Sequence, residues 1–196
     1  MQAKYSDIEF RALSELTATD LSDVDVVVLS SVRANSGAIS PILSSDEQNA
    51  LYNFVLSGGC AILFPDNSTF AGTPESDLAN ESLIDPFGLD IKGTLGGVYT
   101  ATTTLASSPV TSGVTSYLGN FAGWFDGTNG ATVLANIIVS SQEQLSLVEF
   151  VPGHFETGSG RVVVYSDANV FFGGGAGKYS SNTKLFLNSV DACLQP

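Results

Sequence analysis

The sequence predicts an α/β fold of the flavodoxin-like type, a mostly parallel sheet sandwiched by helices, with an antiparallel β insertion in the middle of the chain. Residues 24–29, Cys60–Phe64 and residues 161–165 are continuous apolar runs apart from Asp25 and Arg161, as in strands that are covered on both faces. A helical pattern separates the first two runs, so they form a βαβ unit whose crossover should be right-handed. Residues 98–135 hold only shorter strand-like runs between turn residues, which favours an antiparallel insertion. The length of 196 residues suits one domain, residues 1–196.

The helix between the first two strands has clear start and stop signals. Ser44 or Ser45 can cap its first turn, and Glu47 lies three residues after Ser44, as a capping box requires. Gly58 and Gly59 end it, because glycine enters the left-handed conformation without a Cβ clash. The apolar side chains of this helix recur on one face: Ala50, Leu51, Phe54 and Val55.

The remaining elements follow from local patterns. Residues 8–12 alternate like a half-exposed strand, and residues 30–40 form a polar loop. A short helix is expected from Ser76 or Asp77 to Leu83, ended by Asp85 and Pro86. Further strands are expected at residues 98–105, 120–125 and 131–135, and residues 145–151 and 160–166 flank a hairpin loop. A last helix begins near Ser180 or Ser181.

Composition restricts the partners. The net charge is −13, with only seven Lys and Arg residues, which argues against nucleic acid and against anionic membrane surfaces. No apolar run approaches the ~20 residues of a membrane helix, and the first ten residues lack the apolar core of a signal peptide. The chain is therefore either cytoplasmic or a mature or excised part of a secreted protein. Cys60 and Cys193 can pair if the last helix packs beside the strand of Cys60, or remain two buried thiols.

Three segments resemble the class I glutamine amidotransferase-like superfamily, and in particular its ThuA-like members and the GIFT-type domains of intraflagellar transport. The segments are LSDVDVVVLSS (21–31), LSSDEQNALYNFVLSGGCAILFPDN (43–67), and GRVVVYSDANVF (160–171) followed by SSNTKLFLNSVDACL (180–194). The phrases DPFGL (85–89) and SPVTSGV (108–114) are also similar to these relatives. Members of the superfamily open with a further strand and loop, which this sequence is expected to lack or to have had removed.

The resemblance implies the fold but not the amidotransferase reaction. The superfamily places a nucleophilic cysteine on the turn after the strand equivalent to Cys60–Phe64, where this chain has Asp66 or Asn67. Cys60 lies at the opposite end of that strand. The superfamily's histidine follows the strand equivalent to residues 161–165, where Ser166 and Asp167 stand. Without a thiolate and a neighbouring base, glutamine hydrolysis is not expected.

The first candidate site lies where two buried strands end. In open α/β sheets ligands bind at the carboxyl ends of the strands. The carboxylates there could hold a hard cation or act as acid and base on a glycoside. The alternative is that Asp and Asn only cap helices and shape turns. The residues of this predicted edge are Asp66, Asn67, Ser68, Asp167 and Asn169.

Three further candidates are weaker. Ser68 as nucleophile with His154 as base lacks the Gly-x-Ser-x-Gly turn, and His154, the single histidine, lies in a predicted hairpin loop. Residues 173–178 (GGGAGK) resemble a phosphate loop but lack two of its required residues. Exposed aromatic residues could stack on sugar rings or contact a partner, although such residues usually belong to the core. They are Tyr99, Tyr117, Phe121, Trp124 and Phe125.

The sequence therefore predicts a non-catalytic amidotransferase-like domain used for binding or assembly. We expect it to be part of a larger exported or cell-surface bacterial protein, extracellular or periplasmic, with a protein or carbohydrate partner and no cofactor. Nucleic acid and membrane insertion are not expected. The alternative is a hydrolase of carbohydrates or esters that uses Asp66 and Asp167. A hydrolase requires a concave pocket around these groups, and a binding domain a flat patch or an open sheet edge.

Overall fold

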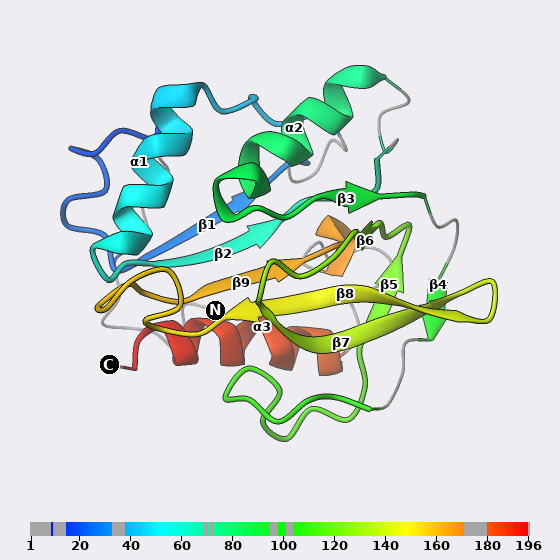
Figure 1. Ribbon diagram of the computed structural model, residues 1–196. Coiled ribbons are helices and arrows are strands. Elements are labelled where there is room, and N and C mark those ends of the chain that lie inside the picture. The colour runs from blue at the N-terminus through cyan, green and yellow to red at the C-terminus, as the bar shows by residue number, and fades with distance from the viewer. Residues whose placement is uncertain are drawn as a thin grey trace.

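A seven-stranded sheet with helices on both faces forms the centre of this computed structural model (Figure 1). The structure describes residues 9, 15–32, 38–68, 70, 73–94, 98–100, 104–170 and 180–195. The main sheet has the order β1-β2-β9-β8-β6-β3, and β7 also pairs with β8. Its strands are β1 (Val26–Ser30), β2 (Cys60–Phe64), β3 (Ile91–Lys92), β6 (Trp124–Phe125), β7 (Thr132–Val139), β8 (Gln142–Phe150) and β9 (Val162–Tyr165). A two-stranded sheet contains β4 (Val98–Thr100) and β5 (Leu118–Asn120).

The three continuous apolar runs are neighbouring parallel strands. β1 pairs with β2 in parallel, and β2 pairs with β9 in parallel through partners such as Ile62 and Val163. This confirms the predicted strands and places their carboxyl ends at one edge of the sheet. β1 was expected to be central, but among the described residues it pairs with β2 alone.

The rest of the sheet is antiparallel, so the sheet is mixed and not mostly parallel. β8 pairs antiparallel with β9, β7 and β6, and β6 pairs antiparallel with β3. The connections explain the difference. Ser140 and Ser141 alone join β7 to β8, whereas parallel strands need a crossover of about a dozen residues or more. Within the predicted antiparallel insertion, β6 and β7 therefore extend the same sheet, whereas β4 and β5 form the separate two-stranded sheet.

Two helices lie on one face of the sheet and one on the other (Figure 1). They are α1 (Ser45–Leu56), α2 (Pro74–Ile84) and α3 (Ser180–Cys193), and the short 3₁₀ turns are η1 (Asp85–Phe87) and η2 (Ala168–Val170). α1 has the predicted capping box: Glu47 N donates to Ser44 Oγ, and Ser44 N donates to Glu47 Oε2 over 2.9 Å. Gly58 follows with φ +99°, as the predicted glycine stop requires.

α2 and the turn after it differ from the prediction. α2 begins at Pro74, two residues before the predicted start, because proline fits the first helical turn, whose N–H needs no partner. Asp85 and Pro86 continue into η1 rather than ending the helical segment, and Gly88 ends it with φ +68°. No helix in the described part of the chain is long and apolar enough to cross a membrane.

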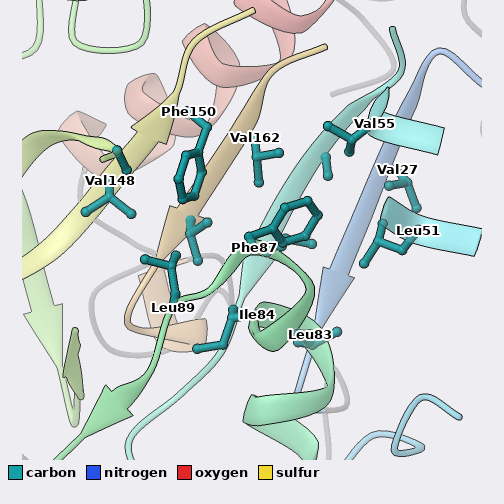
Figure 2. Packing of buried hydrophobic residues seen from close by; sticks show 14 of the residues in the cluster. Val27, Leu51, Val55, Leu83, Ile84, Phe87, Leu89, Val148, Phe150 and Val162 are labelled. Atoms are coloured by element: carbon teal, nitrogen blue, oxygen red, sulfur yellow. The ribbon is translucent and has the colours of Figure 1, made fainter. Parts of the chain in front are cut away.

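The central strands separate two apolar cores. Ala61 and Leu63 face α1, α2 and η1, and Figure 2 shows this core around Phe87 and Phe150. Ile62 and Phe64 face α3 on the opposite side. There the Phe64 and Tyr165 rings stack with centroids 4.8 Å apart. This period of two, with both faces buried, explains why β2 and β9 are continuously apolar.

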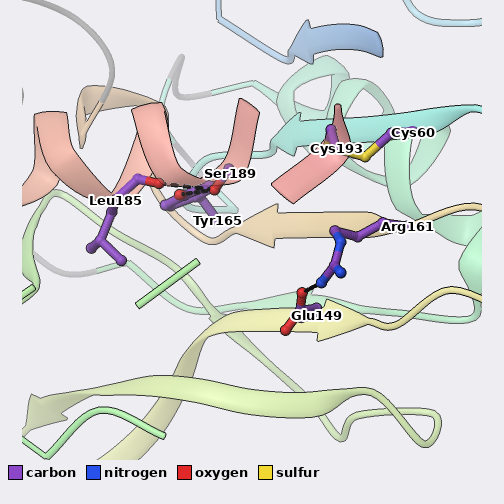
Figure 3. The surroundings of a disulfide bond; sticks show 7 residues. All are labelled: Cys60, Glu149, Arg161, Tyr165, Leu185, Ser189 and Cys193. Atoms are coloured by element: carbon purple, nitrogen blue, oxygen red, sulfur yellow. Dashed lines mark hydrogen bonds and ion pairs between the residues drawn. A yellow bond between two sulfur atoms is a disulfide. The ribbon is translucent and has the colours of Figure 1, made fainter. Parts of the chain in front are cut away.

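A disulfide joins Cys60 at the start of β2 to Cys193 at the end of α3, with Cα atoms 5.5 Å apart (Figure 3). The sequence left the pair open, and the structure shows that the cysteines are bonded. Beside it, the Arg161 guanidinium contacts the buried Glu149 carboxylate. These links tie α3 and β8 to the amino ends of β2 and β9.

Several predictions lie outside the described residues. They are the strand at residues 8–12, apart from Glu9, the loop residues 33–37, residues 101–103 of the strand predicted at 98–105, the side chain of Tyr99, and the glycine-rich residues 173–178. The predicted strand at 120–125 is interrupted. Its ends belong to β5 and β6, and Phe121 between them has φ +60°.

Candidate functional site

The polar residues that follow β2 and β9 lie together, as the sequence predicts. Asp66 and Asn67 come directly after β2 and Pro65, and Asp167 and Asn169 follow β9. Because β2 and β9 are adjacent and parallel, both chain exits open at the same edge of the sheet. We call this group, with two further asparagines that bond to it, the rim cluster: Asp66, Asn67, Asn80, Asn120, Asp167 and Asn169.

The β2 side of the rim cluster is held by α2. Asn80 Oδ1 accepts from Asp66 N over 2.8 Å, and Asn80 Nδ2 donates to Asp66 O over 2.8 Å. Asp66 Oδ1 accepts from both Asn67 N (2.7 Å) and Asn67 Nδ2 (2.9 Å). The side chain of Asn80 therefore satisfies the backbone of the strand exit, while the Asp66 carboxyl holds the next residue in a turn.

The β9 side is held by the end of β5. Asp167 Oδ1 accepts from Asn169 N over 2.7 Å, and Asp167 Oδ2 accepts from Asn120 N. Each carboxyl oxygen of Asp167 is therefore occupied by a backbone N–H group. These bonds fix the start of η2 and the end of β5 against the end of β9.

Amide side chains connect the two halves. Asn169 Nδ2 donates to Asn120 O over 3.0 Å and lies 3.5 Å from Asp66 Oδ2. Asn67 Nδ2 also donates to Phe121 O over 2.6 Å. The rim cluster is thus one network that fastens the segment after β5 to both strand exits.

The two carboxyl groups of the network are buried. Asp66 is 2% exposed and Asp167 is 0% exposed. Burial raises the pKa of Asp66 to about 7, against the lowering effect of the Asn67 hydrogen bonds. Burial, and then the neighbouring Asp66 charge, raise the pKa of Asp167 to about 8, against its bonds from Asn120 and Asn169. Both carboxyl groups therefore stay protonated at pH values well above those at which an aspartate ordinarily loses its proton.

Ser68 differs from the other predicted residues because it reaches a pocket. Its Oγ donates to Gly93 O over 3.2 Å. The pocket has a volume of ≈ 250 Å³ and is mostly acidic, although its Lys92 ammonium pairs with Asp90. It is lined by Ser68, Asp77, Glu81, Asp90, Ile91, Lys92 and Gly93.

The weaker candidates have mixed outcomes. The His154 ring packs 4.9 Å from the Phe150 ring, and Phe150 pairs with Val162 at the amino end of β9. Ser68 follows the carboxyl end of β2, so the pairing of Ser68 with His154 is wrong, and His154 is an exposed loop residue. Among the aromatic candidates, Tyr117 and Phe125 are core residues, Trp124 is half-buried, and Phe121 is 49% exposed.

Sequence reasoning missed three parts of this region. Asn80 faces the sheet from the middle of α2, where an asparagine is an unfavourable helix residue, and this was the available signal. Asn120 joins through its backbone, which leaves no signal in the sequence. Beneath the cluster, Ser146 Oγ donates to Tyr117 Oη over 3.0 Å and lies 2.6 Å from Ser166 Oγ.

The described residues contain no group of three or more His, Cys, Asp or Glu side chains that could hold a metal ion. The hypothesis that Asp66 and Asp167 bind a hard cation also requires carboxylate oxygens that are free to coordinate the ion. All four carboxyl oxygens accept protein N–H groups instead, Asp66 Oδ2 through the long contact from Asn169 Nδ2. The arrangement suits a structural role in the turns.

Comparisons with known proteins identify the fold. No protein-family model and no curated protein matches the sequence. Among solved structures, the mmIFT52 N-terminal domain superposes with a TM-score of 0.72 at 12% identity, covering 100% of this chain and 88% of that one. A putative ThuA-like protein from Bacteroides uniformis has a TM-score of 0.57 at 12% identity, covering 91% and 73%. The fold is ThuA-like.

A third structure agrees. Cytoplasmic protein STM1381 from Salmonella typhimurium has a TM-score of 0.64 at 15% identity, covering 92% of this chain and 76% of that one. At these identities the likeness concerns the fold alone. It supports a fold shared with the ThuA-like protein and with the mmIFT52 N-terminal domain, and this fold does not fix a role.

Proposed function

We propose that this chain is a non-catalytic amidotransferase-like domain, flavodoxin-like in its central βαβ layout, that serves binding or assembly in a larger exported or cell-surface bacterial protein. The main support is the rim cluster. The exits of β2 and β9, where the resemblance would place a nucleophile and a base, hold Asp66 and Asp167, and these are buried and bonded internally. Both cysteines of the sequence are used in the disulfide, so neither supplies a thiolate.

The disulfide also supports the exported location. Disulfides persist in oxidising compartments such as the periplasm and the cell exterior, and are rare in the cytosol. Cys60 and Cys193 are 133 residues apart in sequence, so their bond is a long-range structural link. It favours an extracellular or periplasmic protein.

A hydrolase of carbohydrates or esters remains the second candidate, because one observation favours it. Asp66 and Asp167 have pKa values raised to about 7 and about 8, and carboxyl groups that titrate near neutral pH are typical of general acids and bases. However, a general acid must reach its substrate within hydrogen-bond distance. Burial of both groups weighs against this reaction.

Turnover measurements on the purified chain test the proposal. We expect no hydrolysis of p-nitrophenyl acetate, p-nitrophenyl glycosides or L-glutamine above that of the heat-denatured protein. The matched control is Asp167→Asn, which keeps the shape of the side chain and removes its acidity. Turnover by the wild-type chain that Asp167→Asn abolishes, while the circular dichroism spectrum stays the same, would establish the hydrolase instead.

A second measurement addresses the candidate ligands. Thermal-shift screening with Ca²⁺, Mg²⁺, glucose and galactose should show no cation-dependent stabilisation, because the oxygens of the rim cluster are already bonded. If Ca²⁺ raises the melting temperature, and both Asp66→Asn and Asp167→Asn remove this increase, then the rim cluster is a cation-binding site. A sugar-dependent shift that Ser68→Ala removes would assign the acidic pocket as the binding site.

A further inference from the structure

A second pocket lies at the end of the sheet opposite to the rim cluster. It is bounded by residues 18–25, by the last turn of α1 with Gly58 and Gly59, and by Cys193 of the disulfide. Because Asp25 directly precedes β1 and Cys60 begins β2, we call it the amino-end pocket. Its volume is ≈ 520 Å³, about twice that of the acidic pocket. This volume lies within the range of about 300–1,000 Å³ that is typical of small-molecule sites.

The apolar wall of the amino-end pocket is fixed by the core. Leu21 and Phe54 line the pocket, and both are buried members of the core that packs against α1. The Phe54 ring lies directly against Gly59, where a Cβ atom would come within 2.3 Å of it. Leu21 N donates to Thr17 O over 3.1 Å, which closes the turn that carries Leu21. The wall therefore exists before a ligand binds, as in most small-molecule sites.

The hydroxyl and carboxylate groups of the pocket are hydrogen-bond acceptors. Ser57 Oγ donates its proton to Asn53 O over 2.9 Å, and Ser22 Oγ donates its proton to Thr19 O over 2.8 Å. Each hydroxyl therefore offers a ligand only its lone pairs. The exposed Asp25 carboxylate can only accept, and no described side chain is bonded to it. A ligand that fits these three groups must be a hydrogen-bond donor.

No basic side chain balances these acceptors. Among the described residues that line the pocket there is no Lys, Arg or His, and the last turn of α1 contains no basic residue. The carboxyl end of a helix carries a partial negative charge, equivalent to roughly half an elementary charge. The acidic pocket differs, because its Lys92 ammonium pairs with Asp90. The amino-end pocket therefore favours a ligand that brings its own positive charge.

We propose that the amino-end pocket binds a small organic cation with an apolar body, such as an arylalkylammonium ion. Its N–H groups would bond to the Asp25 carboxylate and to Ser57 Oγ, and its apolar body would pack on Leu21 and Phe54. The net charge of −13 favours the approach of such a cation. The inference rests on the binding role proposed above, and it names a site and a ligand class for that role.

Titration of the complete, isotope-labelled chain with phenethylammonium chloride, followed by NMR, tests the site. Hydrocinnamate is the matched anion, and phenethyl alcohol is the matched neutral compound. The backbone amide signals of residues 21–25 and 57–59 should shift with the cation. The cation should bind about tenfold more tightly than the anion. This preference should shrink between about 50 mM and about 300 mM NaCl, because salt screens exposed charges.

Two variants separate the charge from the apolar wall. Asp25→Asn should weaken binding of the cation about threefold to fivefold and leave binding of phenethyl alcohol unchanged. Ala50→Leu places a larger side chain in the pocket and should remove binding of both compounds. Asn49→Leu is the matched control, because it adds the same side chain at the adjacent, exposed position of α1, which does not line the pocket. It should bind both compounds as the wild-type chain does.

Three outcomes would overturn the inference: amide shifts that do not include residues 21–25 and 57–59, equal affinity for the cation and for hydrocinnamate, or unchanged binding by Ala50→Leu. If Ala50→Leu does not fold, Asp25→Asn replaces it, and equal binding of the cation by Asp25→Asn and the wild-type chain contradicts the proposal. None of these failures restores a hydrolase, which only the turnover measurements with Asp167→Asn can do.

Discussion

Raising the pH should destabilise the protein in a range where most proteins change little. In the unfolded chain an aspartate has a pKa of about 3.9. In the folded chain, burial raises the pKa of Asp66 to about 7, and burial with the Asp66 charge raises that of Asp167 to about 8. Between these limits the folded state holds protons that the unfolded state has released. The stabilisation is therefore complete below about pH 4 and is lost as the pH rises through the folded pKa values.

The size of the effect follows from the number of protons. Each proton held only by the folded state changes the free energy of unfolding by about 1.4 kcal/mol per pH unit. From about pH 5 to about pH 6.5 both carboxyl groups contribute, so stability should fall by about 2.7 kcal/mol per pH unit. That is a large part of the roughly 5–15 kcal/mol by which typical domains are stable.

Urea unfolding followed by circular dichroism at several pH values measures this slope. Asp167→Asn is the matched variant, since it removes one titrating group and should halve the slope to about 1.4 kcal/mol per pH unit. The new amide also meets the N–H groups of Asn120 and Asn169, so the variant should be less stable at low pH. A stability that is constant or rises over this range would refute the reasoning, whatever the absolute values.

Three further predictions concern the frame around the rim cluster. Replacing both Cys60 and Cys193 by Ala should lower the free energy of unfolding by about 3–5 kcal/mol, because the bond closes a loop with a sequence separation of 133; no change in the urea midpoint would contradict this. Ser44→Ala should cost about 1 kcal/mol through loss of the capping box, while Ser45→Ala should cost less, which urea unfolding of both variants checks. Phe121→Gly should raise the free energy of unfolding by up to about 1 kcal/mol, and with it the melting temperature, because φ +60° is unfavourable for Phe. A clearly lower melting temperature would show that the exposed ring makes necessary contacts.

The parts of the fold that the sequence predicted are those with local signals. The capping box of Ser44 and Glu47 marks the start of α1, and Gly58 marks its end. The continuous apolar runs in β2 and β9 show that both faces of each strand are buried, as in the central strands of a parallel sheet. This places Asp66 and Asp167 at one edge, so the core of the rim cluster was predictable.

The other parts depend on contacts or on unusual turns. Ser140 and Ser141 form the β7–β8 turn with φ 49° and 67°, which Asn-Gly or Gly-Gly would have signalled and Ser-Ser does not. The sequence prediction therefore underestimated how much of the sheet is antiparallel. Asn80 and Asn120 belong to the rim cluster through tertiary contacts, and burial of the carboxyl groups depends on those contacts. The sequence showed which polar groups meet but not that they would be enclosed.

The position of the disulfide determines how the molecule would respond to a mechanical load. A pull on the chain just after Cys193 passes through the sulfur bridge into the first residue of β2, which is hydrogen-bonded within the sheet. The terminal helix is thus bypassed and should not unravel first under tension. Chemical reduction would move the load onto that helix, so stretching experiments with and without a reductant should give different first rupture events.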